Sequence, residues 1–289
     1  MPVWSHPVPV PAVHHVAPPL GADGIRWASS GPGAIDYDGD TGRFTLKVDG
    51  RRLAVREGDN LNPGFDDVAV AREPDGRLLV ATVEGRRLVL RDGSRFRTLG
   101  PAKGRGRVVA AVAANGRAVV AWATYDEGIE INDPLRIYAA VREPGARRFG
   151  RARLLDTAEV IGSSFGHLRL ALNARAAVLS WSTRRHRHRR PVRVVRAGAR
   201  GGFGTPVRLA DAYLAAVALR ADGTALAAWA QHYGAVAALA RPGRAFGAPE
   251  RISDGDRAHD IHAAFTPDGR AEVVWGTHRP PSRRLLAIR

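Results

Sequence analysis

The chain has 289 residues, 45% hydrophobic and 25% charged, so it can bury one large core or two small ones. It has no cysteine, which excludes disulfides, thiolate metal sites and cysteine nucleophiles. The net charge of +16 favours an anionic partner, but only Lys47 and Lys103 of the 44 basic residues are lysine. Because a GC-rich genome would also produce this arginine bias, both interpretations stay open.

Residues 1–20 form a proline-rich segment with no basic stretch followed by an apolar one, so we expect no secretion signal in the chain as given. The compartment stays open between the bacterial cytoplasm and, if the N-terminus is truncated, a secreted or cell-envelope location. No apolar run approaches the roughly 20 residues of a membrane helix, and we expect no membrane span. We assign residues 21–289 to one domain.

An irregular repeat copy comes first, in "IDYDGDTGRFTLKVDGRRLAVREG", with Gly42 at its turn. Its segment "DYDGDTG" is a near miss to an EF-hand calcium loop, because the glycine comes one position late and Lys47 replaces the bidentate glutamate. A polar hairpin turn is favoured here. A Ca²⁺ site of different geometry, using Asp36, Asp38 and Asp40, is the alternative.

Five clearer copies follow, each an alternating apolar run, a turn and a second apolar run. They are "VAVAREPDGRLLVATV", "VAAVAANGRAVVAWA", "LRLALNARAAVLSWS", "AAVALRADGTALAAWA" and "IHAAFTPDGRAEVVWG". Asp-Gly and Asn-Gly turns between alternating runs predict β-hairpins, with positive φ at both turn positions. The turn position holds Gly76, Gly116, Arg175, Gly223 and Gly269, and six residues later stand Thr82, Trp122, Trp181, Trp229 and Trp275.

A third apolar run and a Phe-containing strand complete each unit, as in "RIYAAVREPG" followed by "RFGRARLL". Four short strands repeated every 40 to 59 residues predict an all-β fold, a single β-propeller of four-stranded antiparallel blades. Six blades fit best, with five and seven as alternatives. The last unit has three strands, so we expect the segment around "VPVPAVHHVA" to supply the fourth and close the ring.

This cycle of "DGR..VVAWA", a third strand ending in arginine and "FG.P..L" resembles the BNR or sialidase-like propeller repeats over residues 33–289. The resemblance implies the fold. No segment fits the sialidase Asp-box, S-x-D-x-G-x-x-W, and neither the arginine triad nor the nucleophilic Tyr–Glu pair can be placed. Sialidase chemistry is therefore not implied.

In such propellers, the turns between strands 1–2 and 3–4 lie at one end of each blade. The 2–3 loops and the connections between blades lie at the other, where ligands usually bind. We expect repeat-position arginines at the first end to be solvated side chains. They are Arg43, Arg77, Arg117 and Arg270 after the 1–2 turns, and Arg56, Arg91, Arg142, Arg196 and Arg241 at third-strand ends.

The segment "TRRHRHRR" follows Trp181 in a 2–3 loop, and the preceding blade carries the acidic loop "TYDEGIEINDP" at the equivalent position. The two loops could form an ion-pair latch of modest strength, or the basic loop could bind an anionic ligand. Metal capture by His186 and His188 is disfavoured by the flanking arginines. The ligand-binding candidates are Arg184, Arg185, Arg187, Arg189, Arg190, His232 and His278.

Histidines gather at the expected ligand end, most densely in "SDGDRAHDIH". His167, His259, His262 and Asp260 could converge at the central channel, where imidazoles with a carboxylate suit Zn²⁺. Against this, the H-D-x-H spacing puts His259 and His262 on opposite faces of a strand. His259, His262 and Tyr233 are also candidates for general acid–base catalysis. Hydrogen bonding to neighbouring loops is the favoured alternative for these residues, and we expect no cofactor.

The sequence therefore favours a non-catalytic β-propeller binding module, a monomer whose charged loops take an anionic glycan or a protein partner. The alternative is a carbohydrate-active enzyme, either a sialidase-like glycosidase or a lyase on an acidic polysaccharide, with a His/Tyr site at the channel. Nucleic acid is disfavoured because the arginines are spread over the repeat and are not interleaved with aromatics.

Overall fold

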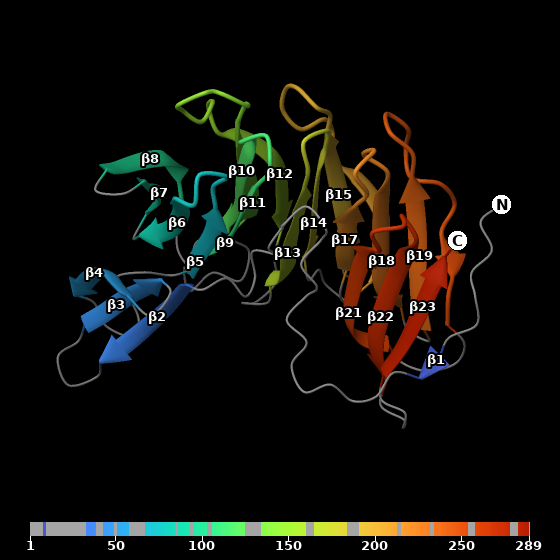
Figure 1. The fold of residues 1–289 in the computed structure, drawn as a ribbon. Helices are drawn as coiled ribbons and strands as arrows, with labels where there is room; N and C mark the ends of the chain where they lie inside the picture. Colours follow the sequence, from blue (N-terminus) through green and yellow to red (C-terminus); the bar gives the residue numbers. More distant parts are fainter. Residues whose placement is uncertain are drawn as a thin grey trace. The chain divides into compact units, whose positions relative to one another are not determined.

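A computed structural model gives the structure of the chain and is all-β (Figure 1). It describes residues 8–9, 33–38, 43–48, 51–57, 67–84, 86–92, 95–102, 106–124, 134–159, 165–183, 191–212, 215–231, 234–253, 258–277 and 283–288. Over these ranges it contains strands and turns, and no helix long and apolar enough to cross a membrane. The chain divides into two compact units, Arg26–Ser163 and Met1–Ile25 with Ser164–Arg289.

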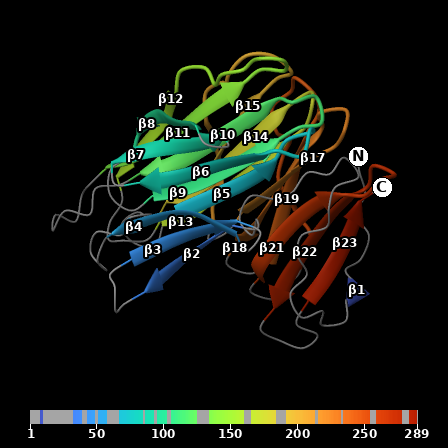
Figure 2. The same cartoon turned by 60° about the vertical axis from the view of Figure 1, so that its left-hand side comes forward.

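The unit Arg26–Ser163 contains three antiparallel sheets in chain order (Figure 2). The first has three strands, β2 (Gly33–Asp38), β3 (Arg43–Val48) and β4 (Arg51–Glu57). The second has four, β5 (Asp67–Arg72), β6 (Leu78–Glu84), β7 (Arg87–Asp92) and β8 (Arg95–Pro101). The third has β9 (Gly106–Val112), β10 (Ala118–Thr124), β11 (Pro134–Arg142) and β12 (Arg153–Glu159). Strand β9 lies against β5 and β6, so the second and third sheets pack as neighbours.

The other unit also contains three sheets. They comprise β13 (Phe165–Leu172), β14 (Ala177–Thr183), β15 (Pro191–Ala197) and β16 (Val207–Asp211); β17 (Ala215–Leu219), β18 (Ala225–Gln231), β19 (Gly234–Ala240) and β20 (Glu250–Arg251); and β21 (Ala258–Phe265), β22 (Ala271–Thr277) and β23 (Arg283–Ile288) with β1 (Val8–Pro9). Strand β17 lies against β13 and β14, and β21 lies against β17 and β18.

Strand β1 pairs with β23 through Val8 opposite Leu285 and Pro9 opposite Arg284. The last sheet thus takes its fourth strand from the segment expected to supply it. The all-β class and the four-stranded antiparallel blades of a β-propeller are confirmed by these topologies. Six sheets are found among the described residues; closure into a six-bladed ring and a single domain over residues 21–289 stay predictions.

The 1–2 turns are hairpins as predicted, but their turn type differs from the expected one. In the first clear copy Glu73 N donates to Arg77 O and Gly76 N donates to Glu73 O, and Gly76 has φ of 86°. This pattern belongs to a three-residue loop, a type I turn closed by a glycine bulge, which needs positive φ at the glycine. Three other copies repeat the pattern. The copy with Arg175 lacks the glycine and has a shorter turn, closed by Asn173 N donating to Ala176 O.

The tryptophan six residues after each turn is a core residue. Trp122, Trp181, Trp229 and Trp275 are all buried, and the shorter Thr82 is buried at the same position of the β5–β8 sheet. Trp122 stacks on Tyr138 and donates from Nε1 to Pro101 O of the preceding sheet, at 2.9 Å. Gly100 permits this approach, because a Cβ there would lie 2.9 Å from the indole. Four of the five copies thus pack an aromatic anchor in a blade rich in alanine and valine, and Thr82 takes its place in the β5–β8 sheet.

A phenylalanine was expected within the fourth strand of each unit, but three of the four phenylalanines lie before that strand begins. Phe96 lies within β8, but Phe149, Phe203 and Phe246 precede β12, β16 and β20. The following glycine explains the difference, because Gly150 N, Gly204 N and Gly247 N each donate back to a third-strand carbonyl. The Phe-Gly pair therefore closes the 3–4 turn.

Candidate functional site at the loop end of β13 and β14

We call the end of a sheet that carries its 1–2 and 3–4 turns the turn end, and the opposite end the loop end. Strand β14 ends at Thr183 and β15 begins at Pro191, so residues 184–190 connect the second and third strands as expected. Residues 125–133, which belong to the acidic loop of the preceding blade, make the equivalent connection between β10 and β11. Both connections lie outside the described residues, as do His232, Tyr233 and His278, and their roles stay predictions.

His167 and Ser182 lie opposite each other on β13 and β14, at the loop end from which residues 184–190 depart. His167 Nδ1 and Ser182 Oγ share a hydrogen bond of 2.9 Å, and both side chains are buried. Burial, with a smaller effect of the Arg169 charge, lowers the pKa of His167 from its ordinary 6.5 to about 3. The imidazole is therefore neutral at physiological pH.

The face that carries this pair meets the next sheet. Ser182, Ser180 and Val178 alternate along one face of β14, and Val178 pairs with Arg196 on β15. Arg196 donates to three carbonyl oxygens of the β17–β20 sheet. The face that carries Ser182, Ser180 and Val178 therefore points towards that sheet.

Several buried polar atoms of these two neighbouring sheets have no hydrogen-bond partner among the residues that the structure describes. They are His167 Nε2 and Ser180 Oγ on the face just described, Asp211 Oδ1 at the end of β16, and Trp229 Nε1 on β18. Trp122, the counterpart of Trp229, donates to the carbonyl of Pro101, and Asp211 is the counterpart of Pro101 because each ends its fourth strand opposite the start of the third. Buried polar atoms in native proteins nearly always have a hydrogen-bond partner, from the protein or from ordered water. These interface atoms can therefore form hydrogen bonds with water or with polar groups of a ligand.

A sequence signal for this polar face was available and was missed. Ser180 and Ser182 flank Trp181, whereas Trp122 is flanked by Ala121 and Ala123, and Trp229 by Ala228 and Ala230. The copy with two serines also has a histidine, His167, opposite the second of them. In the last copy His259 lies at the same position, but it pairs with Gly276 and not with a serine. Comparison of the repeat copies position by position would have singled out this blade.

The expected metal set is described only in part. His167 is buried, whereas the side chain of His262 is exposed on β21; the side chains of His259 and Asp260 lie outside the described residues. His259 pairs with Gly276 and His262 with Val274, so β21 contains one extra residue between them. The strict alternation used against a His259–His262 pair therefore does not apply. No group of three metal-binding side chains occurs within the described part, and the metal site stays a prediction.

The segment compared with a calcium loop connects two paired strands. Asp36 pairs with Thr45 and Asp38 with Arg43, so residues 39–42 join β2 and β3 as the predicted hairpin. Asp40 and the side chains of Asp36 and Asp38 lie outside the described residues.

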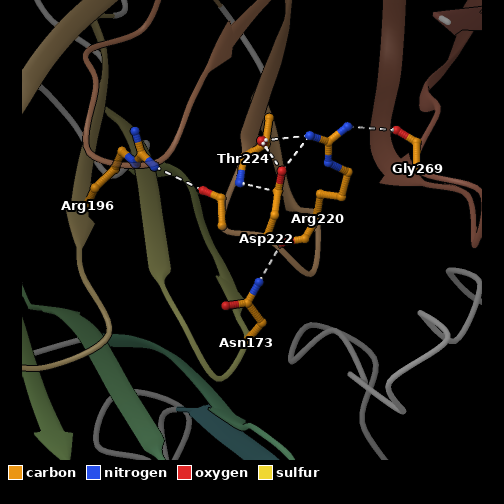
Figure 3. A network of polar contacts seen from close by, with 7 residues as sticks. Asn173, Arg196, Arg220, Asp222, Thr224 and Gly269 are labelled. Carbon is orange, nitrogen blue, oxygen red and sulfur yellow. Dashed lines mark hydrogen bonds and ion pairs between the residues drawn. The ribbon is translucent and has the colours of Figure 1, made fainter.

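Figure 3 shows a polar network at the turn ends of the three sheets of this unit. Asn173 Nδ2 donates to Arg220 O of the next sheet at 2.7 Å, and Arg196 Nη2 donates to Gly223 O at 3.1 Å. Arg220 bonds to Asp222 and Thr224 of its own turn and reaches Gly269 O at 3.5 Å. The Arg220 guanidinium holds the pKa of Asp222 well below its usual range. This end is thus held together by its own side chains.

The prediction that the repeat-position arginines are solvated is wrong for several of them. Arg91 is buried and pairs with Glu84 at 2.7 Å, with 7% and 8% of the two side chains exposed. Arg142 pairs with Glu73 of the preceding sheet at 2.6 Å. Arg117 is fully buried, and burial lowers its pKa. Arg196 is bonded as described, whereas Arg77 and Arg270 are exposed as predicted. The long side chains fold back along the sheets to reach partners that the repeat alone does not reveal.

No protein-family model and no curated protein matches this chain. Similar solved structures include a protein of unknown function from Dyadobacter fermentans, with 13% identity, 93% of this chain and 80% of that chain covered, and a TM-score of 0.45. The polysaccharide lyase Uly1 is 10% identical over 89% of this chain and 76% of that chain, with a TM-score of 0.45. A subtype N10 neuraminidase-like protein of A/little yellow-shouldered bat/Guatemala/060/2010 is 13% identical over 100% and 99%, with a TM-score of 0.41. At these scores the strand topology, and not the likeness, assigns the fold.

Proposed function

We propose that this protein is a β-propeller binding module that takes an anionic ligand at the loop end of the β13–β16 sheet. One observation carries the proposal: two buried polar atoms, His167 Nε2 and Ser180 Oγ, lie on the face beside this loop end and have no hydrogen-bond partner within the described part of the chain. The turn end of the same sheet instead has its polar groups bonded to the neighbouring sheet. A buried donor or acceptor without a hydrogen-bond partner lowers the stability of the fold. A ligand that supplies the missing partner removes this cost.

The sequence of the connecting segment supplies the charge for this proposal. Residues 184–190 contain five arginines and two histidines, and they connect β14, which carries Ser180 and Ser182, to β15. Arginine forms paired hydrogen bonds with carboxylate and sulfate groups, so an acidic glycan is the first ligand class to test. A protein partner with an acidic surface is the second class.

The His167–Ser182 pair favours binding over catalysis. A histidine that activates a serine must accept its proton near neutral pH, and a pKa of about 3 makes the imidazole a weak base. A carbohydrate-active enzyme therefore stays the second candidate, with His259, His262 and Tyr233 as its proposed catalytic residues.

The test is a binding measurement on the wild type and on a variant in which Arg184, Arg185, Arg187, Arg189 and Arg190 are all serine. Labelled acidic oligosaccharides should bind the wild type and lose at least tenfold in affinity with the variant, while neutral oligosaccharides bind neither. The melting temperature should shift by no more than a few degrees. Retained affinity would refute the proposal, and a large loss of stability would instead indicate a latch with residues 125–133. Turnover of any acidic polysaccharide, abolished in His259→Ala or His262→Ala, would establish the enzyme.

A further inference from the structure

A second basic surface lies at the turn end of the β9–β12 sheet, in the turn between β11 and β12. Arg147, Arg148, Arg151 and Arg153 fall within seven residues, and all four side chains are exposed. None of Arg147, Arg148 and Arg151 has a hydrogen bond or an ion pair within the described part of the chain. We call residues 147–153 the arginine turn.

The backbone of the arginine turn is held in place. Ala146 N donates to Glu143 O at 3.0 Å, and Gly150 N donates to Val141 O at 2.9 Å. The Arg142 guanidinium lies over the Phe149 ring, 5.5 Å from the centre of that ring. Arg142 is itself held by its ion pair with Glu73. Because the turn is already ordered, little backbone entropy is lost when a ligand binds it.

The two carboxylates at the turn ends, Glu143 and Glu73, do not pair with Arg147, Arg148 or Arg151 in the described part of the chain. Glu143, at the start of the turn, lies 3.9 Å from the buried Arg117, and Glu73 is bonded to Arg142. The other 3–4 turns hold fewer arginines: residues 91–97 contain Arg91, Arg95 and Arg97, residues 198–206 contain Arg200, and residues 241–249 contain Arg241 and Arg244. The arginine turn is therefore the densest group of exposed arginines in the described residues.

We infer that the arginine turn is a docking surface for a sulfated or carboxylated polysaccharide. Guanidinium groups on a fixed turn match the closely spaced anionic groups of such a chain. Single-stranded nucleic acid is a poorer fit, because its binding surfaces stack bases on exposed aromatics, and Phe149 is partly buried beneath Arg142. This surface is separate from the one proposed at the loop end of β13–β16, and the inference does not depend on that proposal.

The experiment compares two charge-matched variants of the full chain. The test variant carries Arg147→Ser and Arg148→Ser; the control carries Arg86→Ser and Arg87→Ser, an adjacent exposed pair at the loop end of β7 in the same unit. Retention on a heparin column and titration with a labelled heparin oligosaccharide are measured over a series of salt concentrations. The test variant should lose about tenfold in affinity, and its salt dependence should fall by roughly two counterions. Adding Arg151→Ser should weaken binding further, and the control should change affinity less than twofold.

Three outcomes would overturn the inference: no loss in the test variant, an equal loss in the control, or tighter binding of duplex DNA through the same arginines. The five-serine variant of residues 184–190 separates the two surfaces. If only the loop-end proposal fails, that variant binds heparin like the wild type while the test variant loses affinity. If only the present inference fails, the two results are reversed.

Discussion

Arg142 and Arg147 lie five residues apart in the sequence, yet they represent two different regions of the molecule. Arg142, like Arg91 and Arg196, ends or nearly ends a third strand and is bonded to carboxylates or carbonyl groups. Arg147, Arg148 and Arg151 in the arginine turn are exposed and have no hydrogen bond or ion pair among the described residues. The net charge of +16 therefore combines arginines that hold the sheets together with arginines that are free to meet a ligand. Predictions that separate the two groups test this division.

The largest effect is expected at the buried pair of the β5–β8 sheet. Arg91→Ala leaves the Glu84 carboxylate buried without its cation, which should cost about 3–5 kcal/mol of unfolding free energy. Denaturant unfolding measures this loss. The double variant Arg91→Ala, Glu84→Ala is the control and should recover much of it, because no uncompensated charge then remains. A loss below about 1 kcal/mol in the single variant would place Arg91 with the solvated arginines.

The loop end of β13 and β14 should respond to acid. The pKa of His167 lies at about 3 in the folded state and at 6.5 in the unfolded state, so acid favours unfolding. The stabilisation is fully present above about pH 6.5 and is lost towards pH 3, by roughly 1 kcal/mol per pH unit. Between pH 7 and pH 4 the free energy of unfolding should therefore fall more steeply for the wild type than for His167→Asn. Parallel curves would contradict a buried neutral imidazole.

The sequence was sufficient for the repeat, because Asp-Gly and Asn-Gly turns and the tryptophans recur at fixed positions in successive sheets. Alternation also located the loop between Thr183 and Pro191 correctly. The bonded arginines were missed for a geometric reason. Arg196 finds its partners up to 48 residues away in the next sheet, and no local pattern reports how two sheets face each other.

The candidate site was predictable in position but not in environment. His167 was expected at the ligand end, and it lies near the start of β13, at the loop end. Its burial depends on the cover that the next sheet provides, which alternation along β13 cannot reveal. The extra residue in β21 between His259 and His262 could not be predicted either, because no particular residue type in this segment marks the position of the bulge.

The most direct test of the division between the two groups of arginines measures stability and heparin affinity on the same two variants. Arg196→Ala removes a guanidinium bonded to three carbonyl oxygens of the next sheet, and should lose about 1–3 kcal/mol of stability while keeping its heparin affinity. Arg147→Ser with Arg148→Ser should change stability by less than about 0.5 kcal/mol and lose about tenfold in affinity. If both variants lose stability and affinity together, or if the two results are exchanged, the division is contradicted.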